Sequence, residues 1–155
     1  MSHPVWDELL GQPEAIEQLI RAVAGKPDSV HHAWLFTGPA GSGRSNLAKS
    51  FAAALQCAED GCGQCQQCRL VKADAHPDVS MLVTDRVVIS IEEVRDLVSR
   101  SSMATTVGDY RVIIIEDADR MAERTSNVLL KALEEPAEKV VWILCCLLYT
   151  SPSPR

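Results

Sequence analysis

Apolar residues recur along much of the chain at the spacing of an amphipathic helix. In residues 13–24, Ile16, Leu19, Ile20 and Val23 fall on one helical face, because they lie at positions i, i+3, i+4 and i+7. A proline at the start of this segment and a glycine after it agree with a helix of these bounds. The same periodicity predicts helices over residues 45–56, 91–98 and 122–135.

Short apolar runs separate these helical stripes and predict β-strands. They cover residues 32–37, 79–83, 87–89, 111–115 and 140–144. Strands that alternate with helices predict an α/β fold with a mostly parallel sheet flanked by helices. In such sheets, ligands bind at the carboxyl ends of the strands. The loops after residues 37 and 115 are therefore where we expect chemistry.

The first of these loops carries a phosphate-loop pattern. Residues 38–45 match G-x-x-x-x-G-K-[ST], except that an arginine replaces the lysine. Glycines let backbone N–H groups converge on a phosphate at a helix N-terminus, and the last hydroxyl would reach Mg²⁺. Arginine keeps the positive charge, but its planar fork is bulkier than an ammonium. The pattern predicts either a nucleotide site or a P-loop scaffold with weak or no nucleotide binding. The candidate binding residues are Gly38, Gly41, Gly43, Arg44 and Ser45.

The second loop begins with an acidic pair, Glu116 and Asp117. P-loop ATPases place an acidic residue here to hold Mg²⁺, and in the common order an Asp serves the metal and a following Glu orients water. The order is reversed in this chain, so each side chain differs by one methylene from the length its role needs. We therefore expect no intrinsic ATP turnover. A structural interpretation stays open, in which Asp117 and Asp119 begin the next helix and interact with its N-terminus.

Four cysteines lie within a short polar segment, residues 57–68. The C-x4-C-x2-C-x2-C spacing supplies four thiolates, and zinc takes four such ligands in tetrahedral geometry. Four ligands leave no open position for water, so the spacing predicts a structural zinc site. The alternative of reduced, buried cysteines fits poorly with a polar segment. His76 is a conceivable ligand, but we expect it to be a loop residue. The predicted ligands are Cys57, Cys62, Cys65 and Cys68.

Composition and charge narrow the classes of function. The chain has 155 residues, enough for one domain, and a formal net charge of −6. This negative charge argues against a module that holds nucleic acid by its own charge. The apolar runs are too short to span a membrane, and the N-terminus lacks the pattern of a secretory signal. Together with the cysteine usage, these features predict a protein of the reducing cytoplasm that does not bind membranes.

Several motifs point to one known family. They are the P-loop, the four-cysteine insert after the P-loop helix, His76-Pro77-Asp78, and the segment Asn-Val-Leu-Leu-Lys-Ala-Leu-Glu-Glu-Pro at residues 127–136. With residues 5–12, which look like the family's opening segment, they resemble the bacterial clamp-loader AAA+ subunits of DNA polymerase III over residues 1–144. The resemblance implies a P-loop AAA+ domain whose family uses ATP and Mg²⁺. It also implies a replisome subunit that works with gamma/tau and delta subunits, and that reaches the sliding clamp and primed DNA through the assembled complex.

Two types of subunit within this family compete. The gamma/tau motor carries the lysine P-loop and the Asp-Glu pair, whereas the delta-prime type commonly has a degenerate ATP site. Arg44 and the Glu116-Asp117 order resemble the delta-prime type. A P-loop nucleotide kinase is a further alternative, but it would give the motif at residues 127–136 no role. A zinc-stabilised interaction module without enzymatic function is the last alternative.

The end of the chain does not fit the family pattern. Residues 146–155 read Cys-Leu-Leu-Tyr-Thr-Ser-Pro-Ser-Pro-Arg, which looks like a translated sequencing adapter, so we expect a non-native tail. A genuine Ser/Pro-rich tail is the alternative. The expected organisation is then an N-terminal part of an AAA+ domain over residues 1–145. The family's Ser-Arg-Cys arginine finger, helical lid and collar domains are expected to be absent from this chain.

Overall fold

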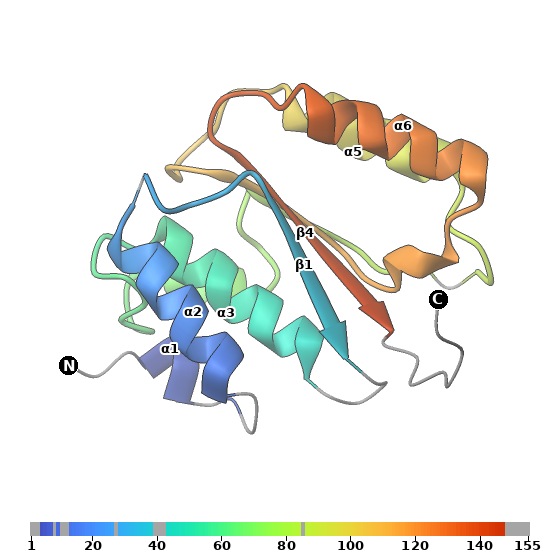
Figure 1. Ribbon diagram of the computed structural model, residues 1–155. Helices are drawn as coiled ribbons and strands as arrows, with labels where there is room; N and C mark the ends of the chain where they lie inside the picture. The colour runs from blue at the N-terminus through green and yellow to red at the C-terminus, as the bar shows by residue number, and fades with distance from the viewer. Residues whose placement is uncertain are drawn as a thin grey trace.

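A four-stranded parallel sheet forms the centre of the molecule (Figure 1). In this computed structural model, the described residues are 4–7, 9, 13–26, 28–38, 43–84 and 86–147. The strands lie in the order β1-β4-β3-β2, so β4 separates β1 from β3 and all neighbouring pairs run parallel. Their bounds are Ala33–Gly38 for β1, Val79–Leu82 for β2, Arg111–Ile115 for β3 and Val140–Leu147 for β4.

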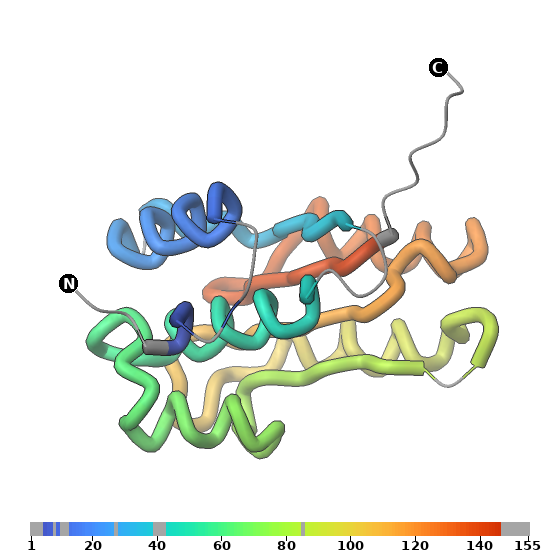
Figure 2. The backbone as a smooth tube through the Cα atoms, turned by 90° about the horizontal axis from the view of Figure 1, so that it is seen from below, coloured from blue at the N-terminus to red at the C-terminus, as the bar shows by residue number. Residues whose placement is uncertain are grey.

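Helices cover both faces of the sheet, as Figures 1 and 2 show. On one face lie α1 (Pro4–Asp7), α2 (Pro13–Ala24), α3 (Arg44–Gln56) and α4 (Gln66–Lys72). On the other face lie α5 (Ile91–Ser101) and α6 (Glu123–Glu134), which pack beside each other. Within the described part of the chain, no helix is both long and apolar enough to cross a membrane.

The two central strands are buried on both faces, which explains their nearly continuous apolar sequence. Successive side chains of a strand point to opposite faces, so β3 contributes to two cores. Val112 and Ile114 pack with α3, whereas Ile113 and Ile115 pack with α5 and α6. The fully buried Trp142 of β4 belongs to the second core. This division of side chains between two cores fixes the register of the strands, because a one-residue slip would exchange the two faces.

Most predicted elements are confirmed, and the predicted α/β class with a parallel sheet is confirmed with them. The helix predicted over 13–24 has these bounds in the structure, and the strand predicted over 111–115 does too. A helix that the sequence analysis did not predict, α4, begins within the cysteine segment. Its first turn is capped by the Cys65 sulfur, which accepts from the Cys68 N–H, so the cysteine spacing itself starts this helix.

Two strand predictions need correction. Residues 87–89 do not form a strand; only Ile89 makes an isolated bridge, to Met121. Val87 and Val88 are exposed instead, because a capping box at Ser90 turns the chain directly into α5. The strand predicted to end at residue 144 continues to Leu147.

The longer β4 also bears on the predicted tail. Cys146 and Leu147, which the sequence analysis placed in the tail, lie in register with Thr37 and Gly38 of β1. Parallel pairing with β1 therefore extends the strand beyond its apolar core, and these two residues belong to the sheet. Residues 148–155 lie outside the described residues. That these residues are a non-native tail stays a prediction.

A buried carboxylate holds the loop that leads into β3. Asp78 is fully buried and accepts hydrogen bonds from the N–H groups of residues 106–108, at 2.7, 2.8 and 2.6 Å. Arg111 contributes an ion pair at 3.4 Å. Burial raises the pKa of Asp78, but these N–H groups and the Arg111 charge outweigh it and hold the pKa below its usual value. Four partners thus stabilise the charged form within the core.

Candidate functional site

The two described ends of the predicted phosphate loop, Gly38 and residues 43–45, lie at the carboxyl edge of the sheet. Strand β1 ends at the buried Gly38, and α3 begins after Gly43. Gly43 has φ 85° and ψ 15°, a left-handed conformation that favours glycine, and its carbonyl accepts the first helical hydrogen bond, from Leu47. Ser45 is half-buried in the first turn of α3. Gly41 falls within residues 39–42, which lie outside the described residues.

Arg44 bridges the ends of two strands. Its guanidinium donates to the Gly38 carbonyl at 2.8 Å and to Asp117 Oδ1 at 2.8 Å, and only 9% of its side chain is exposed. Gly38 ends β1, whereas Asp117 follows β3. The cation that replaces the P-loop lysine therefore has partners within the chain itself. A phosphate would compete with these partners for the guanidinium.

The acidic pair after β3 splits into two environments. Glu116 is buried, and its Oε2 has no hydrogen-bond partner among the described residues. Asp117 is partly exposed, has φ 51°, and binds Arg44 and Arg120. The structural interpretation holds for a short 3-10 helix, Ala118–Arg120, of which Asp117 is the N-cap residue, whereas α6 begins only at Glu123. The Asp117 side chain makes no capping hydrogen bond there and pairs instead with two arginines.

The end of β4 closes this region from the sheet side. The fully buried Cys145 lies with its sulfur 3.9 Å from the Arg44 carbonyl. Burial raises the pKa of Cys145 to about 12, and the negative charge of Glu116 adds to the shift. Its thiol is therefore protonated at neutral pH and does not act as a nucleophile in the site.

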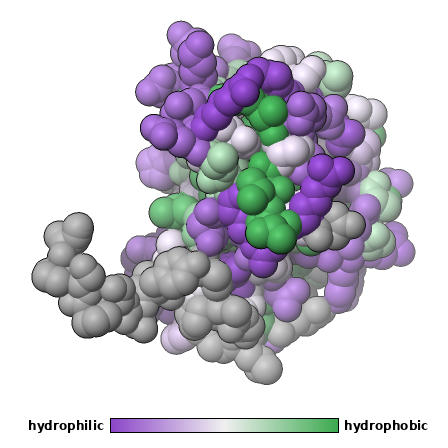
Figure 3. Space-filling view, turned by 90° about the vertical axis from the view of Figure 1, so that its right-hand side faces the viewer, coloured by the Kyte–Doolittle hydropathy of each residue, from purple (hydrophilic) through white to green (hydrophobic). Residues whose placement is uncertain are grey.

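Apolar side chains also gather on this side of the molecule (Figure 3). The loop between β2 and α5 contributes Val83, Val87 and Val88, which are 65%, 85% and 47% exposed. They lie beyond the carboxyl end of β2, the edge strand of the sheet.

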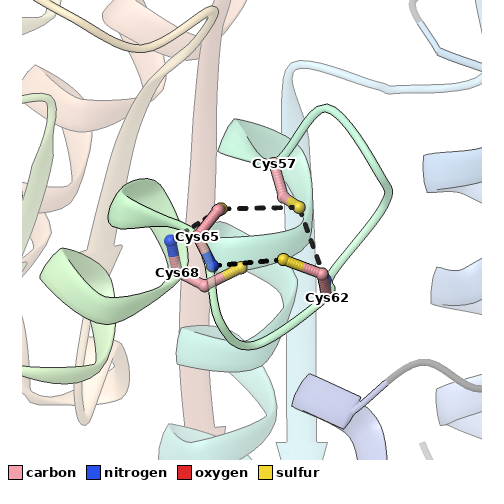
Figure 4. Close-up of side chains that lie close together, drawn as sticks. All are labelled: Cys57, Cys62, Cys65 and Cys68. Carbon is pink, nitrogen blue, oxygen red and sulfur yellow. Dashed lines mark hydrogen bonds between the residues drawn. The ribbon is translucent and has the colours of Figure 1, made fainter.

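The four predicted zinc ligands come together at the opposite end of α3 (Figure 4). Their sulfur atoms all lie within 4.8 Å of one another, and the pair Cys57–Cys65 is 3.7 Å apart. Cys57 and Cys68 are buried, whereas Cys62 and Cys65 are half-buried. The loop reaches this arrangement through left-handed backbone at Asp60, Gly61 and Gly63.

Backbone N–H groups point at these sulfur atoms. Cys57 Sγ accepts from the N–H of Glu59 and of Cys62, and Cys68 Sγ accepts from that of Gly63, at 3.3 to 3.4 Å. Burial raises the pKa of Cys57, but the N–H groups outweigh it and lower the pKa to about 7. Burial raises the pKa of Cys65 and of Cys68. A divalent metal ion would offset this cost, since it binds thiolates and displaces their protons.

The donor set fits zinc. Four thiols converge within the spread of one tetrahedral shell, and zinc prefers thiolate sulfur. His76 is not part of this group: its Nδ1 accepts from the Asp78 N–H at 3.0 Å, and its Nε2 contacts Gln67 Oε1. The cluster therefore brings together all four predicted ligands without the histidine.

The sequence model of one family, described as "DNA polymerase III, delta subunit", matches residues 11–149. The chain belongs to the DNA polymerase III delta subunit family. The predicted resemblance to the clamp-loader subunits of DNA polymerase III is confirmed at this level, and the nucleotide kinase alternative is dropped.

Similar curated proteins carry the names of two subunit types. The delta' subunit of Pseudomonas aeruginosa is 39% identical over 119 residues, which cover 73% of this chain and 36% of the relative. The delta' subunit of Yersinia pestis is 34% identical, with 75% and 36% covered. The tau/gamma subunit of Haemophilus influenzae is 30% identical, with 88% and 20% covered. The chain thus spans little more than a third of the delta' relatives.

A solved structure agrees on the fold. The crystal structure of a DNA polymerase III gamma subunit-related protein from Thermotoga maritima superimposes with a TM-score of 0.57 at 19% identity. The match covers 85% of this chain and 39% of that one. At this identity the likeness supports the fold of this delta-family chain and nothing finer.

Sequence reasoning missed the contacts that decide how these sites behave. The partner of Arg44 is 73 positions away, and no local pattern signals such a pair. Lys26 was also missed: its ammonium lies within 3.5 Å of carbonyl oxygens at the C-terminal end of α3 and 3.3 Å from Asp60. A cation at a helix C-terminus is favourable, but a single lysine after a glycine is too common a pattern to indicate it.

Proposed function

We propose that this chain is the N-terminal part of a delta'-type clamp-loader subunit, which helps to load the sliding clamp onto primed DNA without hydrolysing ATP itself. Its family membership supports a place in the loader. The identities of 39% and 34% to delta' subunits support this type of subunit over the tau/gamma type. In this proposal the chain contributes structure and contacts to the loader rather than chemical work.

The observation that carries the proposal is the internal pairing of Arg44. In a working P-loop a compact ammonium reaches the β- and γ-phosphates. Here a guanidinium whose side chain is 9% exposed is already bound to Gly38 and Asp117, both at 2.8 Å. A triphosphate would have to break the ion pair before it could use this cation. We therefore infer weak or absent ATP binding.

The acidic pair supports the same inference for hydrolysis. Asp117, at the position of the water-orienting carboxylate, is tied to Arg44 and Arg120. Glu116, at the position of the metal-binding carboxylate, is buried beneath it. Catalysis tolerates little displacement of such groups. The two side chains differ in length from those that the two roles need, and the ion pairs of Asp117 hold its carboxylate in place. Ser45 and Gly41 complete a loop that we assign a structural role.

The remaining assignments follow from membership of the loader. We propose that zinc binds Cys57, Cys62, Cys65 and Cys68 as a structural ion. The proposed partners are the gamma/tau and delta subunits, with the clamp and primed DNA contacted through the complex. The proposed location is the cytoplasm, at the replisome on the nucleoid.

Nucleotide titration tests the central inference. The chain, Arg44→Lys and Asp117→Asn should be titrated with Mg·ATP by calorimetry and assayed for phosphate release. We expect no saturable binding at millimolar ATP for the wild type and no turnover in any of the three proteins. Turnover by the wild type that Asp117→Asn abolishes would favour the gamma/tau-type motor, the second candidate. The 88% coverage of this chain by tau/gamma relatives keeps that candidate open.

A chimera tests the place in the loader. Residues 13–147 of this chain would replace the matching part of the P. aeruginosa delta' subunit, which would then be assembled with the other loader subunits of that organism. We expect the chimera to assemble and to load the clamp onto primed DNA. Failure to assemble, with the chimera folded by circular dichroism, would contradict the proposal.

A further inference from the structure

We propose that the four-cysteine loop is a clasp that holds helix α1, residues 4–7, onto helix α3. The clasp would close when the loop binds its metal ion and open when the ion is removed. This inference rests on the zinc binding proposed above, and it assigns a consequence of that binding to residues that are not ligands.

Direct hydrogen bonds join the three segments. The Val5 N–H donates to the Gly61 carbonyl at 3.3 Å, and Ser50 Oγ donates to the Val5 carbonyl at 2.7 Å. Gly61 lies between the first two cysteines of the loop, and Ser50 lies on α3. Val5 is therefore bound from both sides, by the cysteine loop and by the helix. Figure 2 shows α1 beside the loop that follows α3.

Packing at Gly61 is equally tight. This glycine is buried and has φ 112°, and a Cβ atom there would lie 2.6 Å from Val5 Cγ2 and 3.7 Å from Trp6 Nε1. Trp6 is 4% exposed and packs in the core cluster of α3. A cavity of about 290 Å³ has walls from all three segments, including Val5, Ser50 and Cys62. The loop thus forms part of the surface on which α1 is seated.

A second tie reaches the end of α2. Lys26 Nζ donates to the Cys57 carbonyl at 3.0 Å and pairs with Asp60 Oδ1 at 3.3 Å. The same loop that contacts α1 therefore also contacts the chain just after α2. Both segments precede the phosphate loop in sequence, and both contact the cysteine loop through its backbone or through Asp60.

Few apolar groups other than its cysteines fix the shape of the loop. Apart from its cysteines it is mainly polar, with three residues in left-handed backbone conformations, Asp60, Gly61 and Gly63. Apolar burial of the segment is confined largely to its cysteines, and metal binding commonly supplies the free energy that such a loop lacks. When the ion leaves, Gly61 and Asp60 move from their positions. The hydrogen bond between Val5 and Gly61 and the ion pair between Lys26 and Asp60 are then lost. Segments of low local stability open without global unfolding.

Two of the chain's three tryptophans, Trp6 and Trp142, provide the test. Hydrogen exchange of the indole N–H groups would be measured by NMR on the full chain, with zinc bound and after chelation. We expect Trp6 exchange to accelerate by about tenfold or more. Trp142 is fully buried in the separate core with α5 and α6, so its exchange should not change. It is the matched internal control.

Variants that keep all four cysteines separate the clasp from the metal. Gly61→Ala should accelerate Trp6 exchange while the chain still binds one zinc, because the new methyl group meets Val5. Adding Val5→Ala removes the atom it meets and should restore part of the protection. Ser50→Ala should accelerate Trp6 exchange less, since only one hydrogen bond is lost.

The outcomes are distinguishable. Trp6 exchange that stays constant when bound zinc is removed overturns the clasp and leaves the zinc site intact. Equal acceleration at Trp6 and Trp142 also overturns it, because the metal would then hold the whole domain. A chain that binds no zinc defeats the metal assignment and the clasp together, while the nucleotide titration remains a separate test of the loader proposal.

Discussion

The two ends of helix α3 carry the two candidate sites, and they differ in how they meet their ligands. At the C-terminal end, four cysteine thiols converge, and none of the four can balance the negative charge that the others would carry as thiolates. At the N-terminal end, the one cation of the phosphate loop that is described is already paired with Asp117. In the zinc binding that we propose, an external cation stabilises the first site. The second has satisfied its charge from within the chain.

The cysteine motif is intact, whereas the P-loop motif is altered by an arginine in place of its lysine. This difference explains why the two sites differ in their need for a ligand. Burial raises the pKa of Cys65 and of Cys68, and a metal ion that binds their thiolates would offset this cost. The change from lysine to arginine provides a longer planar fork, which reaches a backbone carbonyl and a carboxylate at once. A site can therefore keep most of the sequence pattern of a phosphate loop while its charge serves the fold.

Removal of a zinc ligand should have the largest effect. Cys62→Ser leaves three thiolates, and structural zinc contributes apparent binding free energies of ~10–16 kcal/mol in small peptides. We expect zinc loss and unfolding of at least residues 57–68. Metal analysis should give one zinc per wild-type chain and far less for the variant. A wild-type chain with well under one zinc would remove the contrast between the two ends of α3.

Replacement of Asp78 should have the next largest effect. It forms a structural Asp–Arg pair with Arg111, and its carboxylate also accepts three N–H bonds at 0% exposure. Removal of one partner of a buried pair costs about 3–5 kcal/mol, so Asp78→Ala should lower the free energy of unfolding by this amount. Urea denaturation at neutral pH measures it.

The pH dependence of this pair has a defined sign. Because the folded-state pKa of Asp78 is lowered, its contribution is fully present above the unfolded value of about 3.9. The contribution is lost as the pH falls further, through the folded-state pKa. The stability difference between wild type and Asp78→Ala should therefore shrink below about pH 4. A difference that grows in acid would contradict the assignment of a charged Asp78.

Sequence patterns predicted the frame of this molecule better than its contacts. The period of apolar residues located α2 and β3 to the residue, because burial on one or both faces leaves a direct mark on composition. The cysteine spacing located the four converging thiols that we propose as metal ligands. The exposed valines at 87 and 88 misled the analysis, since two apolar residues carry too little period to separate a strand from a loop. The Arg44–Asp117 pair arises from strand order, which no local pattern encodes.

Breaking the Arg44–Asp117 pair should have a smaller effect than breaking the Asp78 pair. Asp117 is 27% exposed at its side chain and water can replace its partner, so Asp117→Asn should cost about 1 kcal/mol. The released guanidinium should bind inorganic pyrophosphate more tightly than in the wild type, by calorimetry. A cost as large as that of Asp78→Ala, without gain in anion binding, would make the pair purely structural.

The smallest effect is expected from the end of the chain, and it tests where β4 stops. Residues 151–154 alternate serine and proline, and proline cannot donate a hydrogen bond to a sheet. Deletion of residues 148–155 should therefore change the free energy of unfolding by less than about 0.5 kcal/mol.

Deletion of residues 146–155 also removes Cys146 and Leu147, which pair with Thr37 and Gly38 at the entrance to the phosphate loop. The lost ladder bonds should cost about 1–2 kcal/mol. Thermal denaturation of both truncated chains measures the two values. Equal values near zero would place the boundary at 146, as the sequence predicted, whereas a loss above about 2 kcal/mol on removing 148–155 alone would show that the tail belongs to the fold.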